Sequence, residues 1–305
     1  MEDSFLDSTL FPFWILKKGW KSADPFPYTR SMPFNPPKHI ASFSHVTTEI
    51  LSYLGVSDEV TTLKEYCEEE PPASDRNKPE YWFSMAEGRL KSLKADLAIT
   101  FSIGQQDLQK RLKEKGFNVL HLDPRSLREV EDSFIQIGKA TGTLEQAKGL
   151  AQDFSGGLSA LQSKIPPNAY RPKLYVEQWN KPPSAAGGWY SELMPLVGAH
   201  YFPMLSRELS RSVKIEEILK FDPEIILFSI YGSGLTFDPA EVLKRIGWEK
   251  INAVRKRRIF TVEETLLNRP GPRLIDGAKV IQWILGESFW GWPLVQSTFA
   301  RRVVD

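Results

Sequence analysis

Short apolar runs alternate with helix-like segments in the first part of the chain. The runs have the length and composition of strands buried in a parallel sheet, and they are HIASFS (39–44), VTTL (60–63), DLAITFS (96–102) and FNVLHLD (117–123). After the first run comes VTTEILSYLG, whose apolar side chains share one helical face and which Gly55 ends. Further helices are expected at 88–94 and 105–115. This alternation of strands and helices predicts an α/β lobe with a parallel sheet.

A long apolar stripe follows this first lobe, after a helix expected over SLREVEDSFIQIGKAT (126–141). The apolar residues from Leu144 to Leu161 fall on one helical face, and Thr143 with Gln146 three residues later fits a capping box. About 20 residues at 1.5 Å each give a rod of roughly 30 Å. We therefore predict a helix long enough to join two lobes.

The second half of the chain repeats the pattern. Its predicted strands are KLYVEQW (173–179), EIILFSI (224–230) and RRIFTV (257–262), and its predicted helices are WYSELMPLVG (189–198), KIEEILK (214–220), residues 239–247 and IDGAKVIQWILG (275–286), with a Gly/Pro loop after the first strand. The expected fold class is α/β, with two α/β lobes built on central, mainly parallel sheets, a single long helix joining them and a ligand cleft between the lobes. The expected domains are an N-terminal extension (1–37), an N-terminal α/β lobe (38–125), an interlobe helical segment (126–166) and a C-terminal α/β lobe (167–305).

Composition and charge narrow the classes of function. The 305 residues hold 39 Lys and Arg against 38 Asp and Glu, a formal net charge of +1, so no global basic field favours a nucleic-acid partner. The single cysteine, Cys67, excludes an internal disulfide and a cysteine-rich metal site. The unusual feature is aromatic content, 9 Trp, 9 Tyr and 18 Phe, which suits a core or a ligand cleft. We expect a monomer.

The N-terminal segment does not have the features of a secretory signal. Its apolar run LFPFWIL (10–16) is short, and Glu2, Asp3 and Asp7 precede it where a signal carries Lys or Arg. No run approaches the roughly 20 apolar residues of a membrane helix. These features favour a cytoplasmic protein, and the alternative is a periplasmic or lipid-anchored protein whose leader was removed.

The candidate ligand contacts follow the strands, because ligands of open parallel sheets bind outside the carboxyl ends of the strands. Ser44 and Thr47 surround a helix N-terminus, where they cap the helix and could also meet an anion or carbonyl. His45 could contact a metal chelate, although a hydrogen bond to backbone is the reading we favour. Tyr66 could line the ligand face, and Cys67 could bind a soft metal or simply pack a turn.

Aromatic and guanidinium groups complete the predicted site. Six aromatic residues lie at or beside predicted strand ends and cleft loops, and about half of them are expected to face the ligand while the others pack in the core; they are Trp82, Phe101, Trp179, Trp189, Tyr190 and Tyr231. Gln178 and Gly188 belong to the same segments. Arg269 and Arg273 flank a rigid Pro/Gly turn, where each could bind a carboxylate, phosphate or amide, cap a helix or pair with Asp276.

Several of these segments resemble a known family. SHVTTEILSYLG with EYCEEEPP, KADLAITFSIG, EQWNKPPSAAGGWYSELMPLVGA and NRPGPRLIDGA (268–278) are similar to class III periplasmic-binding-protein-like domains, especially their cobalamin-binding branch. The resemblance covers roughly residues 38–290, and NRPGPRLIDGA is its most specific part. It implies a rigid bilobed binder that holds a corrinoid, such as cobalamin, or another metal chelate in its cleft.

The resemblance also bears on partners and on alternatives. Members that feed importers carry one exposed acidic residue per lobe that pairs with permease arginines; Glu216 matches in the second lobe, but Gly88 stands at the first-lobe place, so permease docking is not expected. The sequence contains no Walker loop, GxSxG or HExxH motif, so none of these motifs indicates catalysis or a catalytic metal. We therefore predict a small-molecule binding protein that performs no chemistry. The alternatives are an enzyme that uses Glu177, Glu192 or His45 to move protons, and an importer's binding protein for a siderophore.

Overall fold

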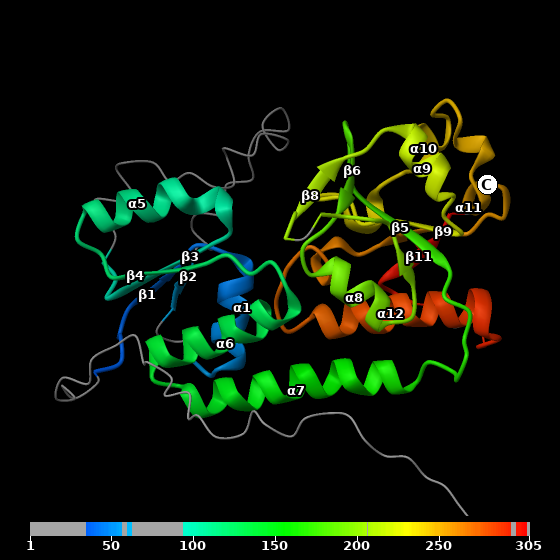
Figure 1. The fold of residues 1–305 in the computed structure, drawn as a ribbon. Helices are drawn as coiled ribbons and strands as arrows, with labels where there is room; N and C mark the ends of the chain where they lie inside the picture. Colours follow the sequence, from blue (N-terminus) through cyan, green and yellow to red (C-terminus); the bar gives the residue numbers. More distant parts are fainter. Residues whose placement is uncertain (1–34, 57–59, 63–93, 206, 294–296, 304–305) are drawn as a thin grey trace, which may run out of the picture. The chain divides into compact units, whose positions relative to one another are not determined.

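A computed structural model describes residues 35–56, 60–62, 94–205, 207–293 and 297–303 of the chain (Figure 1). Residues from Pro36 onward group into one unit. The predicted extension, the helix expected at 88–94 and the candidates Tyr66, Cys67 and Trp82 lie outside the described residues. Among the described helices, none has both the length and the apolar character that crossing a membrane would require.

The first lobe is built on a parallel sheet, as its apolar runs predict. The strands are β1 (Ile40–Ser42), β2 (Val60–Thr62), β3 (Leu97–Phe101) and β4 (Val119–Leu122), in the order β2-β1-β3-β4. Every residue of β1 and β3 is buried, which explains why these runs show no polar alternation. All four strands therefore end at the same edge of the sheet.

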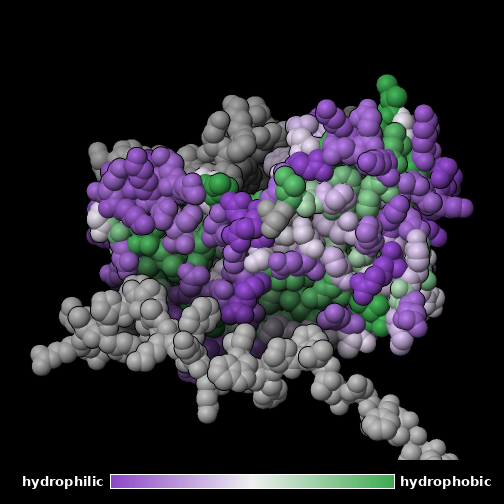
Figure 2. Space-filling model, viewed as in Figure 1, coloured by the Kyte–Doolittle hydropathy of each residue, from purple (hydrophilic) through white to green (hydrophobic). Residues whose placement is uncertain are grey.

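Within the described residues of the first lobe, two helices flank this sheet. Helix α1 (His45–Tyr53) follows β1 directly, and α5 (Gln106–Glu114) connects β3 to β4 through a short 3-10 turn, η1 (Ile103–Gln105). Helix α5 buries Leu108 and Leu112 and turns its charged residues outward, so the region of α5 is strongly hydrophilic in Figure 2. Helix α1 buries its apolar face against the sheet and brings its N-terminus to the carboxyl edge of the strands.

Helices α6 (Leu127–Thr141) and α7 (Leu144–Ser163) join the lobes (Figure 1). They pack tightly because Gly138 lets the chains approach: a Cβ at that position would lie 2.3 Å from the Cβ of Ala147. At its other end α7 contacts α12 (Leu274–Leu285), where Gln282 donates from Nε2 to the carbonyl of Leu161 at 2.6 Å. The long helix predicted from the apolar stripe is thus present.

The capping box predicted for α7 is wrong. Thr143 is the N-cap residue, but its hydroxyl pairs with that of Thr141 at 2.8 Å and makes no capping bond. One helix earlier, at α6, a hydroxyl cap is present: the Glu129 amide donates to Ser126 Oγ at 3.2 Å, and the Glu129 carboxylate accepts from the amide of Arg125, the residue before the N-cap. Local spacing identified the helix but not the hydroxyl that caps it.

The second lobe has a seven-stranded mixed sheet. Its strands are β5 (Lys173–Asn180), β6 (Pro183–Ala186), β7 (His200–Tyr201), β8 (Ser210–Ser212), β9 (Ile225–Phe228), β10 (Ile259–Val262) and β11 (Ala300–Arg302). The order is β11-β10-β9-β5-β6-β8, with β7 beside the start of β5. Strands β5, β7, β9 and β10 are parallel, and β6, β8 and β11 pair antiparallel. The parallel core agrees with the prediction, whereas the antiparallel edges do not follow from the apolar runs.

Short helices cover this second sheet. They are α8 (Tyr190–Leu196), α9 (Ile215–Phe221), α10 (Ala240–Leu243), α11 (Asn252–Arg255), the 3-10 turns η2 (Gly234–Thr236), η3 (Trp248–Lys250) and η4 (Glu264–Leu266), and a π-helical extension of α12, η5 (Gly286–Trp290). The helix predicted at 239–247 is shortened to α10, and Gly247 follows it with φ +90°. The predicted Gly/Pro loop contains β6, which forms a hairpin with β5.

Candidate functional site

The carboxyl ends of strands from both lobes lead to one region, where α1 meets the loop 268–273. A Cβ at Gly271 would lie 3.3 Å from Val46 of α1, so this glycine permits the close approach of the two lobes. The charge of Arg269 lowers the pKa of His45, and Arg273 lies close enough to Glu49 to oppose the rise that burial causes in the pKa of its carboxyl. The lobes therefore face each other through α1 on one side and the Pro/Gly turn on the other.

The hydroxyl groups at the start of α1 serve the helix. Ser44 is the N-cap residue and accepts from the amide of Val46 at 3.1 Å. Thr47 is fully buried, and its hydroxyl donates to the carbonyl of Ser44 at 3.0 Å and contacts Ser42 Oγ. Ser44 is half-buried, whereas the hydroxyl of Thr47 is enclosed and partnered; for both residues a ligand contact stays a prediction.

The charges of second-lobe arginines act on two groups of the first lobe, His45 and Glu49. His45 is exposed at the first turn of α1, and partial burial together with the charge of Arg269 lowers the pKa of its imidazole. A neutral imidazole can donate, accept or bind a metal. Burial raises the pKa of Glu49 against the opposing pull of Arg273 and Arg269, and its Oε1 is enclosed without a hydrogen-bond partner among the described residues.

A pair of aromatic rings marks the second-lobe side. Trp179 ends β5 and Tyr231 follows β9, and their ring centroids lie 5.3 Å apart at 30°. Trp179 is half-buried and Tyr231 is 36% exposed, so the pair presents aromatic surface to solvent. The Tyr231 hydroxyl donates to the carbonyl of Asn268 at 3.4 Å, which ties the ring to the loop 268–273.

Arg245 fixes the strand end that carries Trp179. Its Nη1 donates to both carboxylate oxygens of Glu177, at 3.0 and 2.9 Å, and its Nη2 donates to the carbonyl of Asn180 at 2.6 Å. Tyr175 donates to the same carboxylate. The pairing of β5 with β6 shifts register between Glu177 and Trp179, and this clamp holds the irregular segment in place.

Asn268 is the centre of the second-lobe loop. Its Nδ2 donates to the carbonyl of Ser229 at 2.8 Å, its Oδ1 accepts from the hydroxyl of Tyr190, and the indole of Trp189 donates to the carbonyl of Leu267 at 2.8 Å. Asn268 is itself buried. The loop is therefore held from behind by three hydrogen bonds whose partners lie far apart in the sequence.

Five further predicted contacts are buried in this structure, and their role as ligand contacts stays a prediction. Trp189 is only 6% exposed and Tyr190 is buried, because both rings pack in the core and use their polar atoms on the loop. Phe101, Gln178 and Gly188 are also buried; Gln178 donates to the carbonyl of Leu209 at 3.3 Å, and Gly188 lies against Leu209 and the carbonyl of Arg125. In this structure these five residues support the walls of the region, and a ligand would reach them only after a local rearrangement.

The two arginines of the loop differ in their surroundings. Arg269 has a side chain 31% exposed and lies 4.0 Å from the carboxylate of Glu264. Burial raises the pKa of Glu264, and Arg269 opposes that rise. Arg273 is half-buried and is the N-cap of α12 without a side-chain capping bond, while Asp276 pairs with Lys279 at 2.9 Å. Both guanidiniums thus remain candidates for a ligand carboxylate, phosphate or amide.

The proton handlers of the enzymatic alternative have other tasks. Glu177 is fully buried and bound by Arg245 and Tyr175, and Glu192 accepts from the amide of Leu127 at 2.8 Å, at the start of α6. Within the described residues, no three His, Cys, Asp or Glu side chains are arranged to hold a metal ion. The geometry offers aromatic surface, two guanidiniums and one imidazole, which suits binding.

Sequence reasoning missed three polar residues of this region, namely Glu49, Glu264 and Asn268. Glu49 carries a usable signal, because it lies three residues after Val46 and so falls next to the apolar face of α1. Asn268 and Glu264 carry none, since their partners Ser229, Tyr190 and Arg269 are set by the tertiary fold.

The family and its relatives agree with this geometry. A vitamin B12-binding protein of Vibrio cholerae is 24% identical over 259 residues, covering 84% of this chain and 91% of the relative. An uncharacterised ABC transporter substrate-binding lipoprotein of Bacillus subtilis is 28% identical over 254 residues, covering 80% and 78%. The solved periplasmic haem-binding protein of Vibrio cholerae superposes with a TM-score of 0.65 at 19% identity, covering 81% and 98%.

These relatives are named as periplasmic or lipoprotein binders, so the expected cytoplasmic location finds no support among them. Their names include both vitamin B12 and haem, so likeness of fold does not by itself specify the ligand. A family model described as periplasmic binding protein matches residues 40–266, most of the described body. The two lobes, the joining helix and this match agree: the chain belongs to the periplasmic binding protein family.

Proposed function

We propose that this protein is a substrate-binding protein for a flat metal chelate of the corrinoid class, with cobalamin the first candidate, held between the lobes without chemistry. The observation that carries the proposal is the tilted, partly exposed ring pair of Trp179 and Tyr231, which is bonded to the same loop whose Arg269 acts on His45 of α1. A planar macrocycle buries aromatic and methyl surface well against such a pair. The vitamin B12-binding relatives support the same ligand class.

The charged groups around the pair suit the edge of such a ligand. Arg269 and Arg273 can donate forked hydrogen bonds to amide or carboxylate side chains of a macrocycle. The neutral imidazole of His45 can accept a hydrogen bond or approach the metal. These guanidiniums also favour a second candidate, an anionic chelate such as haem or a ferric siderophore.

We further propose that the protein serves an importer and works outside the cytoplasm, as the names of its relatives suggest. Glu216 is exposed on α9, at the place where the resemblance puts the docking carboxylate of the second lobe. Its first-lobe counterpart, Gly88, lies outside the described residues. Docking through Glu216 is the part of this proposal that a permease-binding assay would test.

The ligand is tested by titration with cobalamin, cobinamide, haem and a ferric hydroxamate, following tryptophan fluorescence and the absorption band of each chelate. We expect saturable binding of a corrinoid. Trp179→Ala should weaken it at least tenfold, about 1.4 kcal/mol, because half of the aromatic pair is lost. Tyr170→Ala removes another exposed aromatic ring, one paired with Phe289, and should leave the affinity unchanged.

The outcomes separate the candidates. Preferred binding of haem or of the ferric hydroxamate would replace the corrinoid by the second candidate. Failure of all four chelates to bind saturably would contradict the proposed ligand class. Equal losses in Trp179→Ala and Tyr170→Ala would place the ligand elsewhere.

A further inference from the structure

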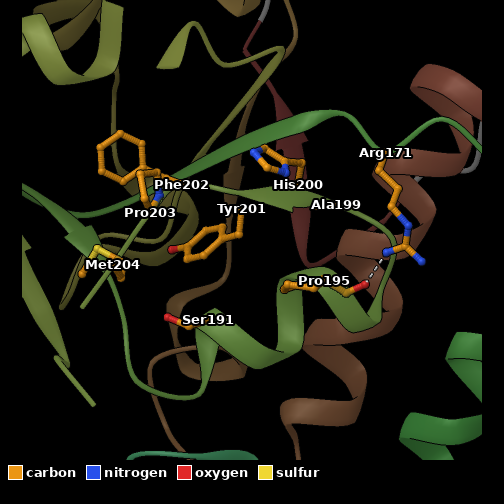
Figure 3. Close-up of a pocket in the computed structure, with 9 residues that line it drawn as sticks. All are labelled: Arg171, Ser191, Pro195, Ala199, His200, Tyr201, Phe202, Pro203 and Met204. Carbon is orange, nitrogen blue, oxygen red and sulfur yellow. Dashed lines mark hydrogen bonds between the residues drawn. The ribbon is translucent and has the colours of Figure 1, made fainter. Parts of the chain in front are cut away.

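A cavity lies in the second lobe, away from the pair of Trp179 and Tyr231. It has a volume of about 420 Å³ and lies between the last turns of α8 and the segment from β7 to Met204 (Figure 3). Its lining is mostly apolar, with Pro195 of α8, Tyr201 of β7 and Met204 among the walls. Cavities of this size with a few polar groups are typical of small-molecule sites.

One end of the cavity carries a cation. Arg171 is exposed, and its Nη1 donates to the carbonyl of Pro195 at 2.8 Å, which anchors the guanidinium at the rim (Figure 3). A guanidinium offers five N–H donors, so this single bond leaves donors for an anion. His200 lines the same cavity and stacks on Phe221, with ring centroids 5.8 Å apart.

One polar group of the lining, the hydroxyl of Ser191, is a donor without a partner among the described residues. Its Oγ is shielded from solvent. An enclosed hydroxyl without a partner is uncommon, and rotation about Cα–Cβ would turn it toward a ligand.

The strand edge adds a backbone donor. The amides of His200 and Phe202 donate to Pro172 and Leu174 on the β5 side. Successive amides of a strand point in opposite directions, so the amide of Tyr201 lies on the other edge of β7. In the described part of the chain β7 pairs only with β5, so this amide has no strand partner.

We propose that this cavity binds a small amphipathic carboxylate, such as a medium-chain fatty acid. The carboxylate meets Arg171 at the rim, and the apolar tail lies along Pro195 and Tyr201 toward Met204, past the hydroxyl of Ser191 (Figure 3). A charged guanidinium beside an apolar wall selects an anion with an apolar tail over a neutral or cationic molecule of the same length. This site is separate from the proposed chelate site and does not depend on it.

The probe is decanoate below its micelle concentration, added to the full chain in isothermal titration calorimetry. We expect saturable one-to-one binding, with decanol at least tenfold weaker. Arg171→Gln should weaken decanoate binding at least tenfold, whereas Ser191→Ala, at a position along the tail and not at the carboxylate, should change it less than twofold. Ser191→Ala removes a hydroxyl that has no partner, so its melting temperature should be unchanged or higher.

Matched variants make the test specific. Arg128→Gln changes another exposed arginine, paired with Asp132 on α6, and should bind decanoate as the parent does. Trp179→Ala should also keep decanoate binding, which separates this cavity from the chelate site. No saturable binding up to about 1 mM, an unchanged affinity in Arg171→Gln, or loss of binding in Trp179→Ala would each overturn the proposal.

Discussion

A single buried carboxylate, that of Glu177, couples the second lobe to pH. Burial raises its pKa to about 7 from 4.5, although Arg245 and Tyr175 both pull it down. Between these values the folded protein binds a proton that the unfolded chain has released, so this contribution to the free energy of unfolding falls as pH rises from 4.5 through 7. We expect Glu177→Gln to lose this dependence, so that the parent's advantage over the variant shrinks by about 1–3 kcal/mol between pH 5 and pH 8.

Urea unfolding of the parent and of Glu177→Gln at pH 5 and at pH 8 gives the two free energies of unfolding. Because the two proteins share all other titrating groups, the contributions of those groups cancel in the difference. Glu145→Gln is the control, because Glu145 is 81% exposed and pairs only with Lys148 on the surface of α7. A constant difference between parent and Glu177→Gln across this range would show that the carboxylate keeps an ordinary pKa. The same clamp explains why sequence could suggest Glu177 as a proton handler but not find Arg245, its partner 68 residues away.

The packing of α6 and α7 gives a prediction about replacing glycine by alanine. Intrinsic helix propensity favours alanine, but at one of the two positions compared there is no room for its Cβ. Alanine is favoured over glycine in a helix by about 1 kcal/mol. At Gly138 of α6, however, a Cβ would lie 2.3 Å from that of Ala147, whereas at Gly149 of α7 no atom lies within 4 Å of an added Cβ. We expect Gly138→Ala to lower the free energy of unfolding by about 1–3 kcal/mol and Gly149→Ala to raise it by about 0.5–1 kcal/mol. Denaturant titration of both variants measures this, and a stabilising Gly138→Ala would contradict the close contact of the helices.

The difference between local pattern and tertiary packing also limits what could be predicted from the sequence. Buried strands such as β3 and β9 and the stripe of α7 carry their own hydrophobic pattern, so the lobes and the joining helix are predictable. Strand β6 (PSAA) has no such pattern; it exists because its small residues fit between β5 and β8. In the candidate site, sequence could not indicate which predicted rings are exposed: Trp179 and Tyr231 are, whereas Trp189 and Tyr190 are buried through hydrogen bonds to a loop 78 residues away.

At the scale of the whole molecule, one continuous core passes through both lobes. It includes Ile50 and Ile99 of the first lobe, Leu158 of α7, and Leu227 and Ile281 of the second. The lobes are further tied by the bond from Gln282 to Leu161 and by the ion pair of Arg207 with Glu129 at 2.6 Å. Neither lobe can therefore unfold without exposing apolar surface of the other.

We accordingly expect the described body to unfold in one cooperative transition, with calorimetric and van't Hoff enthalpies in agreement. Leu158 is 7% exposed and lies on the α7 face that belongs to this shared core. Leu158→Ala should lower the free energy of unfolding by about 2–5 kcal/mol and shift the whole transition to lower temperature without splitting it. Ser159→Ala, next to it on the exposed face, should leave the transition in place. Differential scanning calorimetry distinguishes the two cases. Two separated peaks, in the parent or in Leu158→Ala, would mean that the lobes are independent folding units. A shared core is also the physical reason to expect only a small closure motion between the lobes, and that reason would then be lost.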